Sequence, residues 1–427
     1  MPQLKRLCRA LRRLAAHLLS FNFAALGREL QGLRRRLHEA AHARQNAREL
    51  AAELEGKAAG RRVILFPPTL DWHLPLYQRP QQLASAYSRK ENTLVLYLTA
   101  NNGHDRVNAA EQISPSLYLV NAALARCLPE LLRGARETLV SLSWTANRRY
   151  LELLRPDRLI YEYIDELEIF DGYDAVMRRD HAWLLSHADL TVCTAESLYE
   201  KARPSARRAI YSPNAGDYAF FSQTAQAAAD RRAAACASRY AATLGYYGAL
   251  AEWFDYDLLS AAAQRRPDWL FLLIGMDYDG SLIKSGLLAH PNVLWVPPQP
   301  YERLPSYLRL FDLALIPFRL NDITRSTSPV KLFEYMAAEK PILCSRMREC
   351  LRYSCVETYR DLESFLDKAE ALLARKDDPA RRAALRAEAL RNTWDARTDE
   401  ILLALERAEG REPTKRYSVI QAKTISG

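Results

Sequence analysis

The residues whose types and spacing could do chemistry are concentrated in one segment, which begins at Ser326 and reads STSPVKLFEYMAAEKPILCS. Lys331 and Glu334 lie three residues apart, so a helix would place them on one face near its start. Ser328 is a good N-cap and Pro329 suits the first helical position, so we predict that a helix begins there. A helix N-terminus attracts phosphate, a lysine adds positive charge, and a carboxylate can accept hydrogen bonds from ribose hydroxyls. The segment predicts a nucleotide-diphosphate site. The alternative is an amphipathic helix with a solvated Lys/Glu pair.

The elements around this segment predict an α/β domain over residues 243–390, after an alanine-rich connector at 222–242. We expect strands at 242–248, 270–274, 293–296, 313–316 and 341–344, and helices at 255–265, 302–310, 329–339, 361–374 and 380–390. Gly248 ends the first of these strands and lets the backbone approach a ligand closely. Arg325 and Ser328 lie just before the predicted helix and complete a candidate donor site with Lys331.

The preceding half, residues 61–222, alternates strands and helices in the same way. Short apolar runs predict strands at 63–66, 93–98, 117–120, 138–141, 159–161, 190–193 and 209–211, with helices at 78–88, 146–154, 174–187 and 196–203. Alternating strands and helices indicate a doubly wound parallel sheet, which binds ligands at the carboxyl ends of its strands. The fold class we predict is therefore α/β, with two Rossmann-like domains facing across a cleft.

Polar and aromatic residues follow two predicted strands of the first half. Trp72, His73 and Arg79 come after the first strand, and Asp165 and Glu166 come after a later one. A carboxylate or an imidazole there suits a general base for an acceptor hydroxyl, so Asp165 and His73 are the catalytic candidates. Arg79, Trp72 and Glu166 are candidates for binding the acceptor. For each residue taken singly, a helix cap, a surface charge or a structural ion pair is the alternative.

Several classes of protein are disfavoured by missing motifs. The first strand is not followed by G-x-G-x-x-G, and neither a Walker P-loop nor a nucleophile-elbow serine occurs. The seven cysteines are scattered without metal spacing, which predicts free thiols in a reducing cytoplasm. Asp277 and Asp279 have the letters of a DxD motif but follow a strand where a structural role is expected. We predict no metal requirement.

The positive charge of the chain is confined to its N-terminal segment. Residues 1–62 carry 14 Lys and Arg against 5 Asp and Glu, while the remainder is balanced, which argues against nucleic acid as a partner of the main fold. Residues 1–60 predict a basic amphipathic helical extension that binds an anionic membrane surface or a partner helix. A signal peptide is the weaker alternative, and no stretch is long and apolar enough to span a membrane. Residues 409–427 are expected to form a polar tail.

The whole pattern resembles the two-domain nucleotide-sugar-dependent glycosyltransferases of the GT-B architecture, in a branch related to the retaining family-four-like transferases of polysaccharide and lipopolysaccharide synthesis. The resemblance covers about residues 61–405. It depends on motifs in a fixed order, which are Gln78–Ala84, Tyr161–Glu166, Thr194–Tyr199, Ser212–Asp217, Leu244–Ala249 with Trp253–Asp255, Pro267–Gly275 and Pro329–Tyr335.

The resemblance implies a nucleoside diphosphate sugar in the second domain and a glycan or lipid-linked acceptor in the first, without a cofactor. Glu334 matches the second glutamate of the family's two-glutamate motif and would bind ribose, with Lys331 near the diphosphate. Asp165 lies in a segment resembling the acceptor-side motif. Residues 391–408 would pack back on the first domain. The expected location is the cytoplasm, peripheral on the inner membrane face.

Three departures from the family pattern bear on the site. Ser326 stands where the first motif glutamate is usual, and Glu339 stands where a glycine usually ends the helix. The segment after Gly248 lacks the basic residues that many relatives use on phosphates, so Lys331 and Arg325 must supply that charge. A non-catalytic, membrane-recruited nucleotide-binding scaffold and a sugar epimerase of related fold are the alternatives to a transferase.

Overall fold

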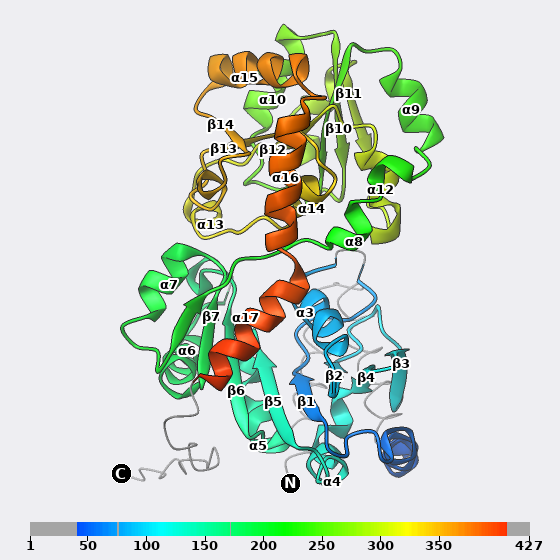
Figure 1. Ribbon diagram of the computed structural model, residues 1–427, viewed down its shortest axis with the longest axis vertical. Helices are drawn as coiled ribbons and strands as arrows, with labels where there is room; N and C mark the ends of the chain where they lie inside the picture. Colours follow the sequence, from blue (N-terminus) through cyan, green and yellow to red (C-terminus); the bar gives the residue numbers. More distant parts are fainter. Residues whose placement is uncertain (1–40, 75–76, 171, 408–427) are drawn as a thin grey trace, which may run out of the picture.

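The computed structural model describes residues 41–74, 77–170 and 172–407. These residues form two α/β domains that are stacked along the long axis of the molecule (Figure 1). Each domain is built on a largely parallel sheet with helices packed on it, so the predicted fold class is confirmed.

The first domain contains an eight-stranded sheet in which only β3 runs antiparallel to its neighbour. In spatial order its strands are β3 (Ala110–Ser114), β4 (Leu117–Asn121), β2 (Thr93–Thr99), β1 (Arg62–Phe66), β5 (Glu137–Leu142), β6 (Arg158–Tyr163), β7 (Leu190–Cys193) and β8 (Ala209–Tyr211). The central strands are continuous apolar runs and are buried, as strands covered on both faces must be.

Short helices connect these strands. They are α3 (Arg79–Ser88), η1 (Ala122–Cys127), α4 (Leu128–Leu131), η2 (Thr145–Tyr150), α5 (Leu151–Leu154), η3 (Leu167–Ile169), α6 (Ala175–His187) and α7 (Glu196–Ala202). Residues 41–54 are also helical, and Leu50 and Leu54 are buried in the core of this domain. The described part of the predicted N-terminal extension therefore packs against the first domain. Residues 1–40, which carry most of the predicted amphipathic pattern, and the tail from 408 lie outside the described residues.

The second domain contains a six-stranded, fully parallel sheet. In spatial order its strands are β11 (Val293–Val296), β10 (Trp269–Ile274), β9 (Ala242–Tyr247), β12 (Leu313–Ile316), β13 (Ile342–Ser345) and β14 (Glu357–Tyr359). The order reverses at β9, which places a switch point between β9 and β12. Ligands bind at such a point in open α/β sheets.

The helices of the second domain cover both faces of this sheet. They are α9 (Arg231–Ala237), α10 (Tyr256–Arg265), α11 (Ser281–Lys284), η5 (Leu287–Ala289), η6 (Tyr301–Arg303), α12 (Leu304–Leu308), α13 (Asp322–Arg325), α14 (Val330–Ala337), η7 (Cys350–Arg352), α15 (Leu362–Ala374) and α16 (Pro379–Arg391). The described helices include none that is both long and apolar enough to cross a membrane.

The chain crosses between the domains twice, and the two crossings touch. The first contains α8 (Tyr218–Phe221) and η4 (Thr224–Gln226), and the second joins α16 to α17 (Trp394–Glu406). The amide of Gly216 donates to the carbonyl of Asn392 over 3.1 Å. Helix α17 then runs across the first domain beside α3, as Figure 1 shows. Its residues Trp394 and Ile401 are buried with the apolar side chains of that domain.

Helix α14 differs from the sequence prediction at both ends. It begins at Val330 with Pro329 in the N-cap position, because the Ser328 hydroxyl is engaged elsewhere. At the other end Glu339 keeps the left-handed conformation that a glycine would adopt, with φ of +56°. Its carboxylate pairs with Arg382 and Arg386 of α16 at 3.0 and 2.6 Å, and these contacts offset the cost of the strained backbone.

Candidate functional site

Two glycines shape the carboxyl edge of the second sheet. Gly248 follows β9 with φ of +135°, and Gly275 follows β10 with φ of +148°. A Cβ atom on Gly275 would lie only 1.8 Å from the Gly248 carbonyl oxygen, so no larger residue fits there. The indole nitrogen of Trp295 donates to the Gly275 carbonyl over 2.9 Å and holds this loop from β11. The two strand ends therefore pack backbone against backbone.

A Gly275→Ala substitution is expected to destabilise the second domain by about 2–4 kcal/mol, from overpacking and from an L side chain at positive φ. The midpoint of urea unfolding measures the loss. Gly286→Ala is the matched control, because Gly286 also has a positive φ of 75° but has open space where the Cβ would lie. Equal midpoints for the two variants would contradict the close packing of the glycine loops.

Lys331 places a positive charge against this glycine edge. It is the second residue of α14, and its ammonium lies 5.1 Å from the ring centroids of both Tyr246 and Phe318. Its side chain also lies next to Gly248. Within the described residues no carboxylate forms a salt bridge with it. Burial lowers the pKa of Lys331 to about 8, although the Glu334 carboxylate acts in the opposite direction. This is an ammonium that lacks an anionic partner.

Glu334 lies one turn further along α14 and is 3% exposed. Its Oε2 accepts a hydrogen bond from the Tyr247 hydroxyl over 2.7 Å, and its Oε1 accepts one from the Tyr301 hydroxyl over 3.2 Å. Burial raises the pKa of Glu334 to about 7, while these hydrogen bonds and Lys331 lower it. The carboxylate that the sequence predicts as a ribose ligand is thus covered by two tyrosines.

Ser328 and Arg325 have different places from those predicted. The Ser328 hydroxyl accepts a hydrogen bond from the Asn214 amide over 3.1 Å and is 5% exposed, so it ties α14 to the first crossing between the domains. A role of Ser328 in donor binding stays a prediction. Arg325 is the last residue of α13, and its side chain is 71% exposed and lies 3.6 Å from Asp322. Its role in donor binding stays a prediction.

Asp165 lies just past the carboxyl end of β6 in the first domain. No hydrogen bond to its carboxylate comes from any part of the chain that the structure describes. Burial raises its pKa to about 6, and the neighbouring Glu166 charge acts in the same direction. A carboxylate with this pKa and without a protein partner is suited to accept a proton near neutral pH.

Glu166 joins the two domains next to Asp165. Its carboxylate accepts hydrogen bonds from the Lys201 ammonium over 2.7 Å and from the Ser326 hydroxyl over 2.8 Å. Ser326 belongs to the second domain and also contacts the Ser197 hydroxyl at 2.7 Å. Glu166 is 8% exposed and bound by both domains, and its role as an acceptor ligand stays a prediction. The contact also brings the segment just before Lys331 against the loop of Asp165.

A second contact across the domain boundary involves the loop after β13. The Glu349 carboxylate accepts a hydrogen bond from the Glu196 amide at the start of α7 over 2.9 Å. Arg348 of the same loop pairs with the carboxylates of Glu196 and Glu200 at 3.1 and 2.8 Å. The two domains are therefore also in contact between the loop after β13 and helix α7.

His73 is held in one orientation by a buried aspartate. The Asp105 carboxylate accepts hydrogen bonds from the backbone amide of His73 over 3.0 Å and from its Nδ1 over 2.9 Å. Because a carboxylate only accepts, Nδ1 carries the proton and Nε2 is turned outward. Burial alone would raise the pKa of Asp105, but hydrogen bonds from Trp72 and His73 contribute to a net lowering. The Asp71 carboxylate holds the loop that contains Asp105, because it accepts hydrogen bonds from the backbone amides of Asn102, His104 and Asp105.

Arg79 and Trp72 turn inward, which corrects their prediction as acceptor ligands. The Arg79 guanidinium forms a buried ion pair with Glu162 at 2.9 Å and donates to the Pro213 carbonyl over 3.2 Å. Trp72 is 7% exposed and packs edge-on against Tyr97 at 5.2 Å between ring centroids. Both side chains support the loops and the crossing rather than presenting a surface to a ligand.

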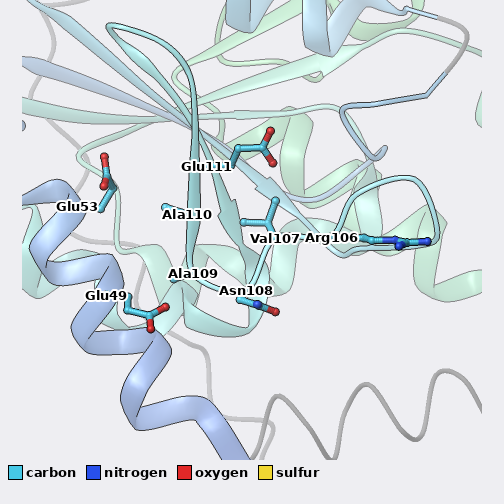
Figure 2. A pocket seen from close by; sticks show the side chains of 8 residues that line it. All are labelled: Glu49, Glu53, Arg106, Val107, Asn108, Ala109, Ala110 and Glu111. Atoms are coloured by element: carbon cyan, nitrogen blue, oxygen red, sulfur yellow. The ribbon is translucent and has the colours of Figure 1, made fainter.

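A cavity of about 360 Å³ opens beside His73 on the first domain. Figure 2 shows it between helix 41–54 and the segment that leads into β3, with Glu49 and Glu53 on the helix and Glu111 on β3. His73 Nε2 lies 3.7 Å from the Glu111 carboxylate. The cavity is therefore lined by three carboxylates, the Asn108 amide and the Arg106 guanidinium, and the imidazole of His73 lies next to one of these carboxylates.

Asp277 and Asp279 have structural contacts. The Asp277 carboxylate accepts hydrogen bonds from the backbone amides of Leu282 and Ile283. The Asp279 carboxylate accepts hydrogen bonds from the backbone amides of Glu252 and Ser281. Across the described ranges, no group of three or more His, Cys, Asp or Glu side chains is arranged to hold a metal ion.

The sequence analysis did not identify four residues that contact the candidate site residues, namely Asp105, Lys201, Tyr247 and Tyr301. Tyr247 had a usable signal, since it ends a predicted strand next to Gly248. The others contact the candidate residues only through long-range folding, and nothing in their local sequence indicates it.

Comparison with known proteins agrees with this architecture. The structure superposes on the sucrose-phosphate synthase of Thermosynechococcus elongatus with a TM-score of 0.58 at 16% identity, covering 82% of this chain and 99% of that one. It also superposes on HepE of Anabaena, solved in complex with UDP, with a TM-score of 0.57 at 14% identity, covering 81% of this chain and 100% of that one. These likenesses establish the fold, and the chain has the two-domain GT-B architecture.

Sequence comparison identifies one family profile and one curated relative. Residues 256–403 match a family profile described as "Glycosyl transferase-like". TuaH of Bacillus subtilis (strain 168), named as a teichuronic acid biosynthesis glycosyltransferase, is 27% identical over 230 residues. That match covers 51% of this chain and 57% of TuaH, so the chain spans little more than half of this relative. The chain has the GT-B fold, its residues 256–403 are similar to the glycosyl transferase-like family, and its place in the family-four-like branch stays a prediction.

Proposed function

We propose that the protein transfers a sugar from a nucleoside diphosphate sugar to a hydroxyl of a glycan or lipid-linked acceptor in cell-surface polysaccharide synthesis. The observation that carries the proposal is the unpartnered Lys331 ammonium at the glycine edge of the second sheet, with the unpartnered Asp165 carboxylate in the facing domain. The Ser326–Glu166 hydrogen bond joins the two segments. The names of HepE structures with UDP and UDP-glucose, and the name of TuaH, support this reading.

In the proposed reaction the acceptor hydroxyl attacks the anomeric carbon of the donor sugar, and the bond from that carbon to the diphosphate oxygen breaks. The diphosphate leaves with the bonding electrons, and the Lys331 ammonium stabilises the charge that develops on it. Asp165 accepts the proton of the acceptor hydroxyl. No redox or covalent cofactor takes part in these steps.

The cavity beside His73 is the proposed place for part of the acceptor. Its three carboxylates and the Asn108 amide can accept hydrogen bonds from the hydroxyls of a glycan, and the Arg106 guanidinium can donate to them. The protein would act in the cytoplasm at the inner membrane face, where residues 1–60 would bind an anionic surface or a partner helix.

Glu334→Gln is expected to weaken UDP binding by about 1.5–3 kcal/mol at pH 8, because a ribose hydroxyl would lose a charge-assisted hydrogen bond. Isothermal titration calorimetry with UDP measures this, after a thermal-shift panel of nucleoside diphosphates and their sugars has confirmed the nucleotide. Glu363→Gln, on the exposed face of α15, is the matched control. If Glu334→Gln binds UDP as tightly as the unmodified chain, the assignment of Glu334 to ribose is wrong.

A non-catalytic nucleotide-binding scaffold is the second candidate. It is favoured by the engagement of Ser326 and Glu334 in protein hydrogen bonds. Release of UDP from a labelled UDP-sugar in the presence of a glycan acceptor distinguishes the two, because a scaffold binds nucleotide without turning it over. An acceptor requirement would also exclude an epimerase.

A further inference from the structure

Each carboxylate oxygen of Glu334 accepts one hydrogen bond, and because the side chain is only 3% exposed, its remaining lone pairs are covered in the described conformation. One oxygen is taken by the Tyr247 hydroxyl at 2.7 Å and the other by the Tyr301 hydroxyl at 3.2 Å. The two contacts are unequal, and the Tyr301 hydrogen bond is at the long limit for an O–H donor. A ligand hydroxyl that reaches Glu334 must displace one of these tyrosines, and Tyr301 is the one held less tightly by the carboxylate.

Tyr301 is also bound by the facing domain. Its hydroxyl accepts a hydrogen bond from the Gln82 side-chain amide over 3.1 Å, and Gln82 belongs to α3 of the first domain. Its ring packs against Tyr77 of the first domain and against Phe220 of the first crossing, both at 5.4 Å between ring centroids. Tyr301 therefore contacts both domains and the crossing between them at once, and moving it disturbs all three contacts.

We infer that Tyr301 is a gate on the ribose side of the donor site, held shut by Gln82 from the facing domain. Its hydroxyl occupies the carboxylate oxygen that a ribose hydroxyl would take, so donor binding and the Gln82–Tyr301 contact exclude each other. When Tyr301 moves away, the Glu334 carboxylate loses the hydrogen bond from the Tyr301 hydroxyl. A ligand with two neighbouring hydroxyls can replace that hydrogen bond, so the gate favours ligands with a vicinal diol. This inference rests on the proposed nucleotide site and adds a selectivity-determining residue to it.

The test compares Tyr301→Phe and Gln82→Leu with the unmodified full chain in calorimetric titrations. The probes are UDP and 2′,3′-dideoxyuridine 5′-diphosphate, which lacks both ribose hydroxyls. Tyr301→Phe removes only the competing hydroxyl, so UDP is expected to bind about 3- to 10-fold more tightly, while affinity for the dideoxy nucleotide is unchanged.

Gln82→Leu is expected to tighten UDP binding as well, but by a smaller factor. Tyr240→Phe, which removes a hydroxyl bonded to the Pro291 carbonyl in the same domain, is the matched control and should change neither affinity.

Four outcomes would overturn the gate. Weaker UDP binding by Tyr301→Phe would mean that the hydroxyl contributes to the ligand site. Equal tightening of both nucleotides would mean that Tyr301 acts on another part of the ligand. Unchanged affinity in Tyr301→Phe, with UDP binding intact in the unmodified chain, would reject the gate and leave the proposed function standing. If neither the unmodified chain nor Tyr301→Phe binds UDP, the gate and a uridine donor are both rejected; the proposed nucleotide site itself fails if no nucleoside diphosphate of the thermal-shift panel binds.

Discussion

Asp165→Asn is expected to reduce sugar transfer by about 10²- to 10⁴-fold, the usual contribution of a general base, while leaving UDP affinity unchanged. The amide is nearly the same size as the carboxylate but cannot take up the proton of the acceptor hydroxyl. Because Asp165 belongs to the first domain and Lys331 to the second, donor binding and proton transfer should be separable. Release of UDP from the UDP-sugar selected by the thermal-shift panel measures the first quantity, and calorimetry measures the second.

The pH dependence gives an independent check on Asp165. Its carboxylate has a pKa of about 6, so the basic form dominates above that value. The rate should therefore rise as pH increases through about 6 and level off above 7, and this rise should be absent from the residual rate of Asp165→Asn. Asp174→Asn, at the exposed start of α6, is the control for a general effect of losing a negative charge. A rate that is unaffected by Asp165→Asn would remove Asp165 from the mechanism and favour His73.

Lys331→Met is expected to weaken UDP binding by about 1.5–3 kcal/mol, which is on the order of 10- to 100-fold in Kd. The ammonium has no salt-bridge partner in the described part of the chain, so a diphosphate would be its first strong anionic contact. Methionine keeps much of the side-chain volume near Tyr246 and Phe318 while removing the charge. For the same reason the substitution should not lower the midpoint of thermal unfolding.

The sign of the pH effect on binding follows from the pKa of about 8 for Lys331. Only the ammonium form attracts the diphosphate, so the contribution of Lys331 to UDP affinity should fall as pH rises through about 8, by at most tenfold per unit. Lys331→Met should bind weakly at every pH in this range, and Lys284→Met, on exposed α11, should retain both the affinity and its pH profile. Full affinity in Lys331→Met would show that the anion site lies elsewhere.

Most of the fold was predictable from apolar runs, and the failures have a common physical reason. Strands buried on both faces are continuous runs such as Trp269–Ile274, which a periodicity argument finds easily. Strand β3 reads AEQIS and is only partly buried at the sheet edge, so it lacks this signal. Strand β14 has only three residues. Both strands lie at sheet edges, where pairing with one neighbour stabilises them without full burial. The other two edge strands, β8 and β11, were predicted because each keeps a short apolar run.

The candidate site was predictable in its position along the chain but less so in the direction of its side chains. The three-residue spacing of Lys331 and Glu334 correctly put them on one helix, and strand ends correctly located Asp165 and His73 at the sheet edge. Arg79 and Trp72 follow the same strand as His73 yet turn into the protein, because Glu162 and Tyr97 are available there through long-range folding. Glu334 likewise faces two tyrosines that are distant in sequence.

The return of α17 to the first domain has a consequence for the order in which the chain can mature on the ribosome. The last strand of the first sheet ends at Tyr211, but Trp394 and Ile401 of α17 complete the apolar packing on that sheet. Roughly 180 residues separate these points, and at 5–20 residues per second their synthesis takes about 10–40 s. During that time the growing chain carries an uncovered apolar surface on its first domain, which is a binding site for nascent-chain chaperones. A gene shortened before Trp394 would make this exposure permanent.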